Sequence, residues 1–364
     1  MPPRVLVAMS GGVDSAVAAA LLHEQGYDVL GVTLRLYTEA DDLALSSRRT
    51  CCGIEDVGDA QDAARRIGIP HYVLNMEREF ASDVMSPFIE AYATGRTPNP
   101  CLACNERVKF STLLDRALAM GADFLATGHY ARIRHGESGY RLLSAADDAK
   151  DQSYVLYTLG QDALGRTLLP LGDLPKTETR RIAASLGMRV ADKPDSADIC
   201  FVPQGNYREW LTAHGVQSLP GPLLDVSGAE LGTHGGITGF TVGQRRGLGL
   251  PGPERRFVTA LDASRNAVVV GDASDLERTW LRATDARWVN ARPEPGTRVF
   301  ARTRYHAPLT PALVTPSGSD GFTLDFEQPV RAIAPGQAAV LYASSNADGS
   351  AEVIGGGTIE ESRR

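Results

Sequence analysis

The sequence predicts an α/β fold in which a doubly wound parallel sheet is followed by a small central domain and a C-terminal antiparallel β-barrel. In the first half, short apolar segments alternate with Ala- and Leu-rich segments of helical character, as in a sheet with helical crossovers. From about residue 205, glycine and proline divide the chain into short pieces and helical periodicity disappears. From about residue 279, alternating runs recur between turns, which favours a barrel. We therefore expect domains at residues 1–203, 204–275 and 276–364.

The individual elements follow from apolar runs that end at glycine or at a polar loop. In the first half we expect strands at residues 4–9, 27–36, 71–74 and 123–127, and helices at residues 15–24, 56–67 and 109–120. In the last part we expect strands at residues 298–303, 321–326 and 338–342. Doubly wound sheets bind ligands outside the carboxyl ends of their strands, so the loops after the first strands are the expected place for a site.

Composition restricts the class of protein. The chain of 364 residues has 44 acidic and 37 basic side chains, a formal charge of −7, and 43% hydrophobic and 22% charged residues, which is typical of a globular protein. A pI near 5.6 argues against a protein that coats nucleic acid by bulk charge, although it leaves room for a local basic patch. No apolar run approaches the roughly 20 residues of a membrane span and no signal peptide is recognisable, so we expect a cytoplasmic protein without a membrane partner.

A candidate phosphate-binding loop follows the first expected strand. Residues 10–15 read Ser-Gly-Gly-Val-Asp-Ser and lie between a strand and a helix, where backbone N–H groups and two hydroxyls gather at a helix N-terminus. The loop has neither the lysine of a Walker motif nor the dinucleotide glycine pattern. The alternative is a glycine turn in which Ser10 or Asp14 caps the helix. The complete string in this setting favours phosphate binding.

Cysteines form a second group of candidates. Cys101 and Cys104 are three residues apart, where a following helix would present both from its first turn, and Cys200 comes much later. A helix N-terminus lowers the pKa of a thiol, so these are candidate thiolates. One Cys-x-x-Cys pair is half of a zinc site, and the sequence offers no second pair to complete it. For Cys51 and Cys52, a buried-thiol or loop-disulfide role is adequate.

Several motifs occur in one order along the chain, and together they resemble a known family. They lie at residues 10–15, 97–105, 127–130, 150–154, 195–201, 243–249, 304–305 and 334–337. Residues 10–15 resemble the PP-loop of the N-type ATP pyrophosphatases, and the whole set is similar to the tRNA-specific 2-thiouridylases. The resemblance covers nearly the whole chain. It implies a tRNA-uridine 2-sulfurtransferase that replaces the C2 oxygen of the wobble uridine, U34, in the tRNAs for Lys, Glu and Gln.

The resemblance also implies a mechanism and cofactors. ATP, with Mg²⁺, adenylates the C2 oxygen of the uridine so that AMP becomes a leaving group. Cys200 corresponds to the family's persulfide carrier, which a cysteine desulfurase or a sulfur-relay protein loads. Cys104 matches the residue that resolves the persulfide, either freeing sulfide or leaving a Cys104–Cys200 disulfide that must later be reduced.

Carried over residue by residue, the resemblance assigns a nucleotide site and a tRNA surface. Leu34 is either a backbone contact to adenine or ribose or a core residue. The nucleotide positions are Ala8, Met9, Ser10, Gly11, Gly12, Val13, Asp14, Ser15, Leu34 and Gly128. The tRNA positions are Pro98, Asn99, His129, Lys150, Asp151, Gln152, Arg245, Arg246, Arg304, Tyr305 and Gln337. Arginines hold phosphate without reading sequence, and an Arg-Tyr pair suits single-stranded nucleotides.

One departure from the family leaves the mechanism open. Cys101 stands where some members have an aspartate that is a candidate general acid or base. Either Cys101 or a neighbour takes part in proton transfer, or Cys101, Cys104 and Cys200 hold three irons of a four-iron cluster whose fourth iron carries sulfide. A third interpretation is a non-catalytic RNA-binding protein whose three thiols hold structural zinc. Such a protein would bind tRNA without turning over ATP.

Overall fold

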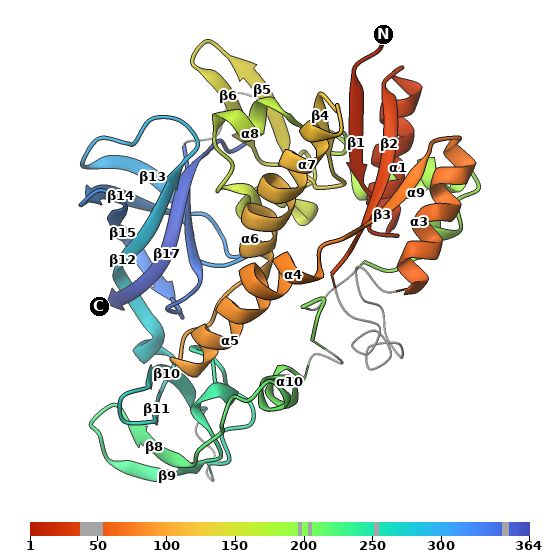
Figure 1. Cartoon of the computed structure of the whole chain (residues 1–364). Helices are drawn as coiled ribbons and strands as arrows, with labels where there is room; N and C mark the ends of the chain where they lie inside the picture. Colours follow the sequence, from red (N-terminus) through yellow and green to blue (C-terminus); the bar gives the residue numbers. More distant parts are fainter. Residues whose placement is uncertain (37–53, 196–198, 203–205, 251–254, 344–348) are drawn as a thin grey trace. The chain divides into compact units, whose positions relative to one another are not determined.

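The computed structural model describes residues 1–36, 54–195, 199–202, 206–250, 255–343 and 349–364 (Figure 1). Cys51 and Cys52 lie outside these residues. The chain divides into two compact units, each assembled from separate stretches of sequence. The first comprises Met1–Met85, Pro100–Asn206 and Ser345–Val353, and the second comprises Ser86–Asn99, Tyr207–Ser344 and Ile354–Arg364.

A parallel sheet organises the first unit. Within the described residues it has five strands, in the order β3-β2-β1-β4-β7. The chain moves outward from β1 to β2 and β3 and then returns to the other side of β1 with β4, so the direction of winding reverses between β1 and β4. The strands of this unit are β1 (Arg4–Ala8), β2 (Asp28–Arg35), β3 (His71–Asn75), β4 (Phe124–Ala126) and β7 (Thr167–Leu168), with a separate hairpin of β5 (Arg132–Gly136) and β6 (Gly139–Leu143).

Helices cover both faces of this sheet. α1, α3 and α9 pack together on one face, and the continuous run from α6 to α7 lies on the other (Figure 1). The middle of that run, η2 (Cys104–Leu113), has π-helical hydrogen bonding. The helices of the unit are α1 (Val13–Glu24), α3 (Ile54–Ile67), α4 (Glu77–Phe80), η1 (Ala81–Met85), α6 (Pro100–Ala103), η2, α7 (Leu114–Ala119), η3 (Asp148–Lys150), η4 (Ser153–Leu156), α8 (Gln161–Gly165), α9 (Lys176–Ser185) and η5 (Arg189–Asp192).

The second unit contains a small mixed sheet and a closed barrel. The sheet has the order β10-β11-β8-β9, and the antiparallel barrel has the order β12-β15-β14-β13-β16-β17. Its helices are α5 (Ser86–Ala93), α10 (Tyr207–Ala213), η7 (Ile237–Gly239) and η8 (Ser274–Leu276). Its strands are β8 (Gly221–Asp225), β9 (Glu230–His234), β10 (Phe257–Asp262), β11 (Ala267–Gly271), β12 (Glu277–Trp288), β13 (Thr297–Arg302), β14 (Thr310–Ser317), β15 (Gly321–Arg331), β16 (Ala338–Tyr342) and β17 (Val353–Arg363).

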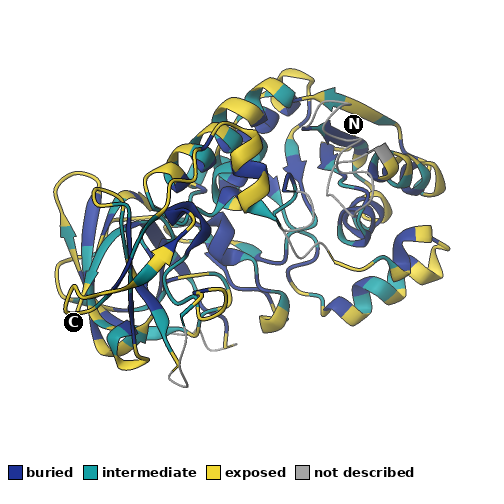
Figure 2. Cartoon of the chain, turned by 90° about the horizontal axis from the view of Figure 1, so that it is seen from below, coloured by how far each residue is buried: buried dark blue, intermediate teal, exposed yellow. Residues whose placement is uncertain are grey.

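Each folded layer has its own apolar core. In the first unit, Val5, Leu6 and Val7 of β1 are fully buried, and the small Ala18 and Ala19 let α1 approach the sheet closely. Burying one such valine or leucine contributes roughly 1.5–3 kcal/mol, so these cores supply most of the stability. Figure 2 shows the buried residues on the strands and the exposed ones on loops and outer helix faces. In the described part of the chain, no helix is long and apolar enough to cross a membrane.

The predicted fold class is confirmed, and the differences are local. Strand β16 has the predicted limits, and β1, β2, β3 and β4 differ from the predicted limits by one residue at one end or at both ends. The expected helix at 109–120 begins nine residues earlier, at Pro100, because Pro is well suited to the first position of a helix. After residue 205, where helical periodicity disappears, the chain still forms the helix α10, whose buried residues are Trp210 and Leu211. A helix of two turns is too short to show a clear apolar period.

Candidate functional site

The loop between β1 and α1 has the geometry of a phosphate-binding turn. Gly11 has a φ of +70°, which disfavours residues with a Cβ atom. A Cβ at Gly11 would lie 2.2 Å from the carbonyl oxygen of Asp56, so the start of α3 packs directly against the loop. The sequence therefore needs glycine here for two independent reasons, and the turn brings the N-terminus of α1 to the carboxyl edge of the sheet.

Alternate residues of this loop are accessible. Ala8, Ser10, Gly12 and Asp14 are partly exposed, whereas the residues between them are buried. The backbone of Met9 is already used, since its N–H donates to the Val32 carbonyl and its carbonyl accepts from the Thr33 hydroxyl. Of the expected nucleotide positions within residues 8–15, these four are therefore the ones that a phosphate group can reach.

The first turn of α1 keeps its N–H groups available. Gly12 occupies the N-cap, and within the described residues no side chain makes the capping hydrogen bond. The Ser15 hydroxyl instead lies 3.1 Å from the Gly12 carbonyl and accepts from the Ser10 N–H. The alternative in which Ser10 or Asp14 caps the helix is thus wrong. Uncapped N–H groups at a helix start favour an anion.

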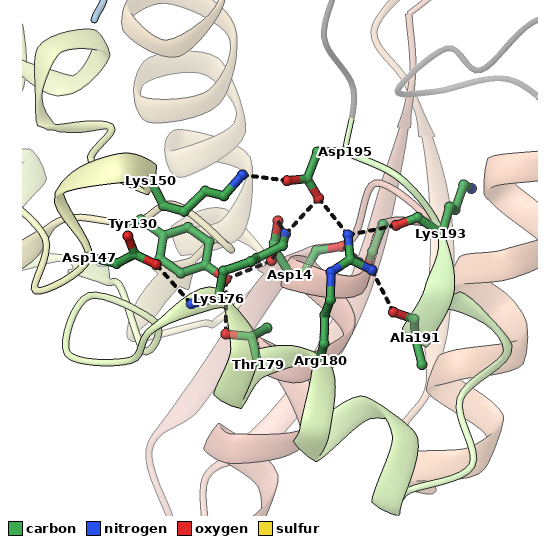
Figure 3. A network of polar contacts seen from close by, with 12 residues as sticks. Asp14, Tyr130, Asp147, Lys150, Lys176, Thr179, Arg180, Ala191, Lys193 and Asp195 are labelled. Atoms are coloured by element: carbon green, nitrogen blue, oxygen red, sulfur yellow. Dashed lines mark hydrogen bonds and ion pairs between the residues drawn. The ribbon is translucent and has the colours of Figure 1, made fainter.

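Asp14 is held by residues from distant parts of the sequence (Figure 3). Its two carboxylate oxygens lie 2.6 and 2.7 Å from the Lys176 ammonium, and the Tyr130 hydroxyl donates to Oδ1 at 2.8 Å. A phenol has a single proton, so Tyr130 accepts its second hydrogen bond from the Thr179 hydroxyl at 2.9 Å. Burial, and then the charge of Asp14, raise the pKa of Tyr130, which keeps it a donor.

Asp195 connects three cationic side chains just before the segment that carries Cys200. It pairs with Lys150 at 2.8 Å, Lys176 at 2.9 Å and Arg180 at 3.0 Å (Figure 3). Partial burial, the largest single influence, raises its pKa, but the hydrogen bonds and charges of Lys150 and Lys176 outweigh it and hold the pKa at about 2. Lys150, expected to contact tRNA, is therefore paired with a carboxylate that an RNA phosphate would have to replace.

Lys193 connects the phosphate loop to α3. Its ammonium lies 3.0 Å from the Gly11 carbonyl and 2.7 Å from both Asp56 and Asp59 on α3. Burial lowers the pKa of Lys193, but the hydrogen bonds to the two carboxylates outweigh burial, and the net shift is upward. The lysine stays charged and joins the loop to α3.

The Gly128-His129-Tyr130 motif packs against the start of α1. A Cβ at Gly128 would lie 2.7 Å from the Asp14 carbonyl carbon and the Ser15 nitrogen, so no larger residue fits. Burial, and then the charge of Lys109, hold the pKa of His129 well below its ordinary value. His129 is therefore neutral near pH 7 and can offer RNA a hydrogen bond or a ring face, but no positive charge.

Asp151 and Gln152 are engaged within the protein. The Asp151 carboxylate is buried and accepts from the N–H groups of Ala145 and Ser153 and from the Ser153 hydroxyl. Gln152 accepts from the Tyr130 N–H through Oε1 at 2.9 Å and donates its own N–H to the Tyr130 carbonyl. A contact to RNA at Asp151 would therefore have to come from its backbone. The side chain of Leu34 is likewise buried in β2, which leaves only its backbone for a nucleotide.

The three cysteines expected to act in sulfur transfer have different surroundings. Cys101 is exposed in α6, Cys104 is buried at the first position of η2, and Cys200 is of intermediate exposure in a turn. That turn is anchored by Phe201, which is 2% exposed and meets Phe80 edge to face at 5.6 Å. In the described residues, no group of three His, Cys, Asp or Glu side chains is arranged to hold a metal ion.

The glycine-rich segment 243–249 presents two arginines. Arg245 and Arg246 are both exposed. Gln244 fixes the loop beneath them, because its Oε1 accepts from the Thr241 N–H and its Nε2 donates to the Arg246 carbonyl. The backbone of Gln244 and that of Gly243 both bond to Val258 of β10. The two guanidinium groups therefore extend from a fixed loop, as the expected phosphate contacts require.

The remaining expected tRNA residues belong to the barrel and to residues 97–99. Arg304 is exposed and Tyr305 half-buried in the loop after β13. Gln337 donates through Nε2 to the Thr97 carbonyl at 2.8 Å, and the Thr97 N–H donates to Pro335 at 2.9 Å. Gln337 thus fixes the backbone immediately before Pro98 and Asn99, both of which are partly exposed.

Sequence reasoning did not identify Lys176 and Lys193 as parts of the site. Lys176 is separated from Asp14 by 162 residues and Lys193 from Gly11 by 182. No local pattern encodes such pairings. The available indication was indirect: both lysines flank helical segments between two motifs that the sequence did identify, at residues 150–154 and 195–201.

Comparisons with known proteins agree along the whole chain. Family models match residues 3–204 (tRNA methyl transferase HUP domain), 208–272 (tRNA methyl transferase PRC-barrel domain) and 278–359 (aminomethyltransferase beta-barrel domain). The tRNA-specific 2-thiouridylase MnmA of Roseiflexus castenholzii is 48% identical over 98% of this chain and 99% of its own length. That of Moorella thermoacetica is 49% identical over the same shares. Among solved structures, NMN synthetase from Francisella tularensis is 18% identical, with a match that covers 57% of this chain and 71% of that protein and a TM-score of 0.34.

The first family model spans more than half of the chain, and the two relatives match this chain over nearly its full length. The chain therefore belongs to the tRNA-specific 2-thiouridylases, enzymes that transfer sulfur to uridine in tRNA.

Proposed function

We propose that the protein uses ATP to replace the C2 oxygen of U34 by sulfur in the tRNAs for Lys, Glu and Gln, in the cytoplasm. The observation that carries the proposal is the uncapped phosphate loop at the start of α1, in a chain of the 2-thiouridylase family. A uracil carbonyl has no leaving group, so an ATP-binding site beside a uridine-modifying activity has a clear chemical purpose. U34 must leave the anticodon stack to expose C2.

In the first step, the C2 oxygen of U34 attacks the α-phosphate of ATP and pyrophosphate leaves. Backbone N–H groups at the start of α1 hold the phosphates, and the accessible positions of the loop are Ala8, Ser10, Gly12 and Asp14. Mg²⁺, when bound, would neutralise phosphate charge through the phosphate oxygens and water that it prefers as ligands. Asp14 is the one carboxylate of residues 8–15, and its two oxygens already pair with Lys176. The product is an O-adenylated uridine in which C2 can be attacked.

In the second step, a persulfide on Cys200 attacks C2 through its terminal sulfur, and AMP leaves. The Cys104 thiolate then attacks the Cys200 sulfur, so that the bond between the two sulfur atoms breaks and its electron pair stays on the sulfur bound to C2. The result is 2-thiouridine and a Cys104–Cys200 disulfide, which an external dithiol reduces. A cysteine desulfurase or a relay protein then reloads Cys200. We assign Cys101 to proton transfer because it is the exposed member of the Cys101-x-x-Cys104 pair.

We also propose that residues 1–203 activate the uridine and that residues 204–275 and 276–364 hold the tRNA. Arg245, Arg246 and Arg304 bind phosphate, and Tyr305 stacks on an unpaired base. The exposure of the three arginines supports this assignment. Lys150, Asp151 and Gln152 meet the flipped-out uridine and its flanks, and His129 lies where the RNA approaches. Pro98, Asn99 and Gln337 are further tRNA contacts.

The test is ATP-dependent thiolation of an unmodified tRNA-Glu transcript by anaerobically purified protein, with iron and acid-labile sulfide measured in the same samples. Cluster-free protein supplied with a persulfide donor is expected to form 2-thiouridine, and Cys200→Ser is expected to abolish it. A transcript with cytidine at position 34 serves as the control for the modified position. Thiolation that follows iron content and is lost equally in Cys101→Ser, Cys104→Ser and Cys200→Ser would instead establish a three-cysteine cluster. Tight tRNA binding with bound zinc and no ATP turnover would refute the enzyme mechanism.

A further inference from the structure

Lys176 approaches the phosphate loop from inside the protein. Its ammonium contacts both oxygens of Asp14 and also Asp195, yet its side chain is only 10% exposed, compared with 31% for Asp14 (Figure 3). The carboxylate is therefore the more accessible partner of the pair. A lysine in this place acts on the loop through Asp14 and is poorly placed to meet solvent or ligand itself.

The first turns of α9 are built around Asp14. Lys176 is the first residue of α9, and Thr179 follows one turn later on the same side of the helix. Thr179 donates to Tyr130, and Tyr130 donates to Asp14. One helix thus fixes the same carboxylate twice, directly by an ion pair and indirectly through a phenol.

This arrangement solves a conflict within the loop. Asp14 lies in the first turn of α1, where a carboxylate is attracted to the free N–H groups at the helix start. Those are the groups that a phosphate needs. A carboxylate free to rotate would compete with phosphate for the N–H groups and would repel its negative charge. Lys176 and Tyr130 remove both difficulties, because they hold the Asp14 oxygens and compensate the charge.

We propose that Lys176 is a positioning residue for the ATP-dependent step: it acts through Asp14 to keep the N–H groups of the phosphate loop available to the nucleotide. The inference rests on the proposed function, since it concerns the same ATP site. It differs from a direct role in phosphate binding, in which Lys176 would act independently of Asp14. It also differs from a role in folding alone, which would leave the Michaelis constant for ATP unchanged.

The test is a double-mutant cycle on ATP kinetics with Lys176→Met, Asp14→Asn and the combined variant. Lys176→Met leaves a partly buried carboxylate without its cation and is expected to lower kcat/KM for ATP by about 100-fold, mainly through KM. In the Asp14→Asn background, the same change is expected to have less than about a threefold further effect. The loop then has no carboxylate for Lys176 to position, and Asp195 keeps Lys150 and Arg180 as partners. Arg181→Met is the matched control: Arg181 lies on the same helix but pairs with Glu178 at the exposed surface.

The outcomes separate the inference from the proposed function. Independent effects of Lys176→Met and Asp14→Asn, or an equal loss in Arg181→Met, overturn the inference while wild-type thiolation continues. Absence of thiolation in the wild type contradicts the proposed function instead. If Lys176→Met does not fold, Tyr130→Phe removes one donor to Asp14 and leaves the ion pair in place. It is expected to raise KM for ATP by about tenfold in the wild-type background and to have no effect in Asp14→Asn.

Discussion

The phosphate loop and the segments of the second unit that we propose to bind tRNA use charged residues in opposite ways. Around the loop, Lys176 is buried and Lys193 half-buried, and each is held by two carboxylates. In the second unit, Arg245, Arg246 and Arg304 are exposed. Charges around the loop fix backbone geometry, and removing one partner of such a pair costs much free energy because the other charge stays unpaired. Exposed charges contribute small, salt-dependent and nearly independent amounts to stability or binding. The difference predicts the kind and size of effect that each substitution will have.

The largest effect on activity is expected at Gly128, because there is no room for a Cβ atom beside the phosphate loop. A Cβ placed 2.7 Å from backbone atoms of Asp14 and Ser15 must displace the loop, because backbone cannot move aside as a side chain would. Gly128→Ala is expected to lower ATP-dependent thiolation by about 100-fold, as a displacement of about 1 Å does in a preorganised site. The measurement is kcat/KM for ATP, with tRNA affinity in the absence of ATP as the control. Unchanged kinetics would mean that the loop tolerates displacement.

The next largest effect is expected at Lys193, and it is an effect on the stability of the protein. Lys193→Met would leave Asp56, whose side chain is 8% exposed, and Asp59 without their shared cation. The expected loss is about 3 kcal/mol in the free energy of unfolding, measured with urea. The raised pKa of Lys193 keeps it charged throughout the neutral range, so its contribution is lost only as the pH rises through that raised pKa. Arg189→Met, which removes an exposed pair with Asp62, should change stability by less than about 1 kcal/mol.

The phosphate loop and Lys193 differ in how far the sequence could predict them. The string at residues 10–15 identified the phosphate loop because strand, turn and helix are local features, and the turn needs glycine at position 11. Alternation in the last part of the chain identified the barrel for the same reason. Lys193 could not be found in this way, since its partner Gly11 is 182 residues distant and pairing depends on tertiary packing. Nor could the sequence indicate that Asp151 is buried and that its carboxylate accepts a hydrogen bond from the nearby Ser153 N–H.

A third prediction uses pH to examine a neutral residue of the first region. The pKa of His129 is depressed in the folded protein, chiefly by burial, so the unfolded chain binds a proton near pH 6.5 that the folded chain does not. The stabilising contribution of the neutral form is complete above about pH 6.5 and decreases as the pH falls below it. As the pH falls below that value, the free energy of unfolding of His129→Gln should therefore decrease less than that of the wild type, by at most about 1.4 kcal/mol for each pH unit. The measurement is urea unfolding of both proteins at pH 7 and at pH 5. Equal losses in the two proteins would show that folded His129 takes up its proton at the same pH as the unfolded chain.

Smaller effects are expected in the second region, where charges act singly. Arg304→Ala should weaken tRNA binding by about threefold to tenfold and reduce the slope of log affinity against log salt concentration by about 0.7 to 0.9. KM for ATP should stay unchanged. Arg298 is the matched control on the barrel, because its guanidinium already pairs with Glu327 at the exposed surface. A loss of affinity at constant salt slope in Arg304→Ala would place Arg304 away from phosphate.

The smallest effect on tRNA binding is expected at Gln337. This residue belongs to the second unit, but, like the residues around the phosphate loop, it fixes a distant part of the backbone. Its amide is bonded to Thr97, 240 residues away, so Gln337→Ala should cost about 1 kcal/mol in stability and leave a carbonyl unsatisfied. Because Gln337 is neutral, tRNA affinity should fall by no more than about threefold, with the salt slope unchanged. A parallel loss of stability and affinity would mean that Gln337 acts by fixing the backbone before Pro98 and Asn99. Affinity lost at full stability would mean that its amide leaves Thr97 to bind RNA directly, and the contrast between fixed and exposed residues would then not follow the division between the two units.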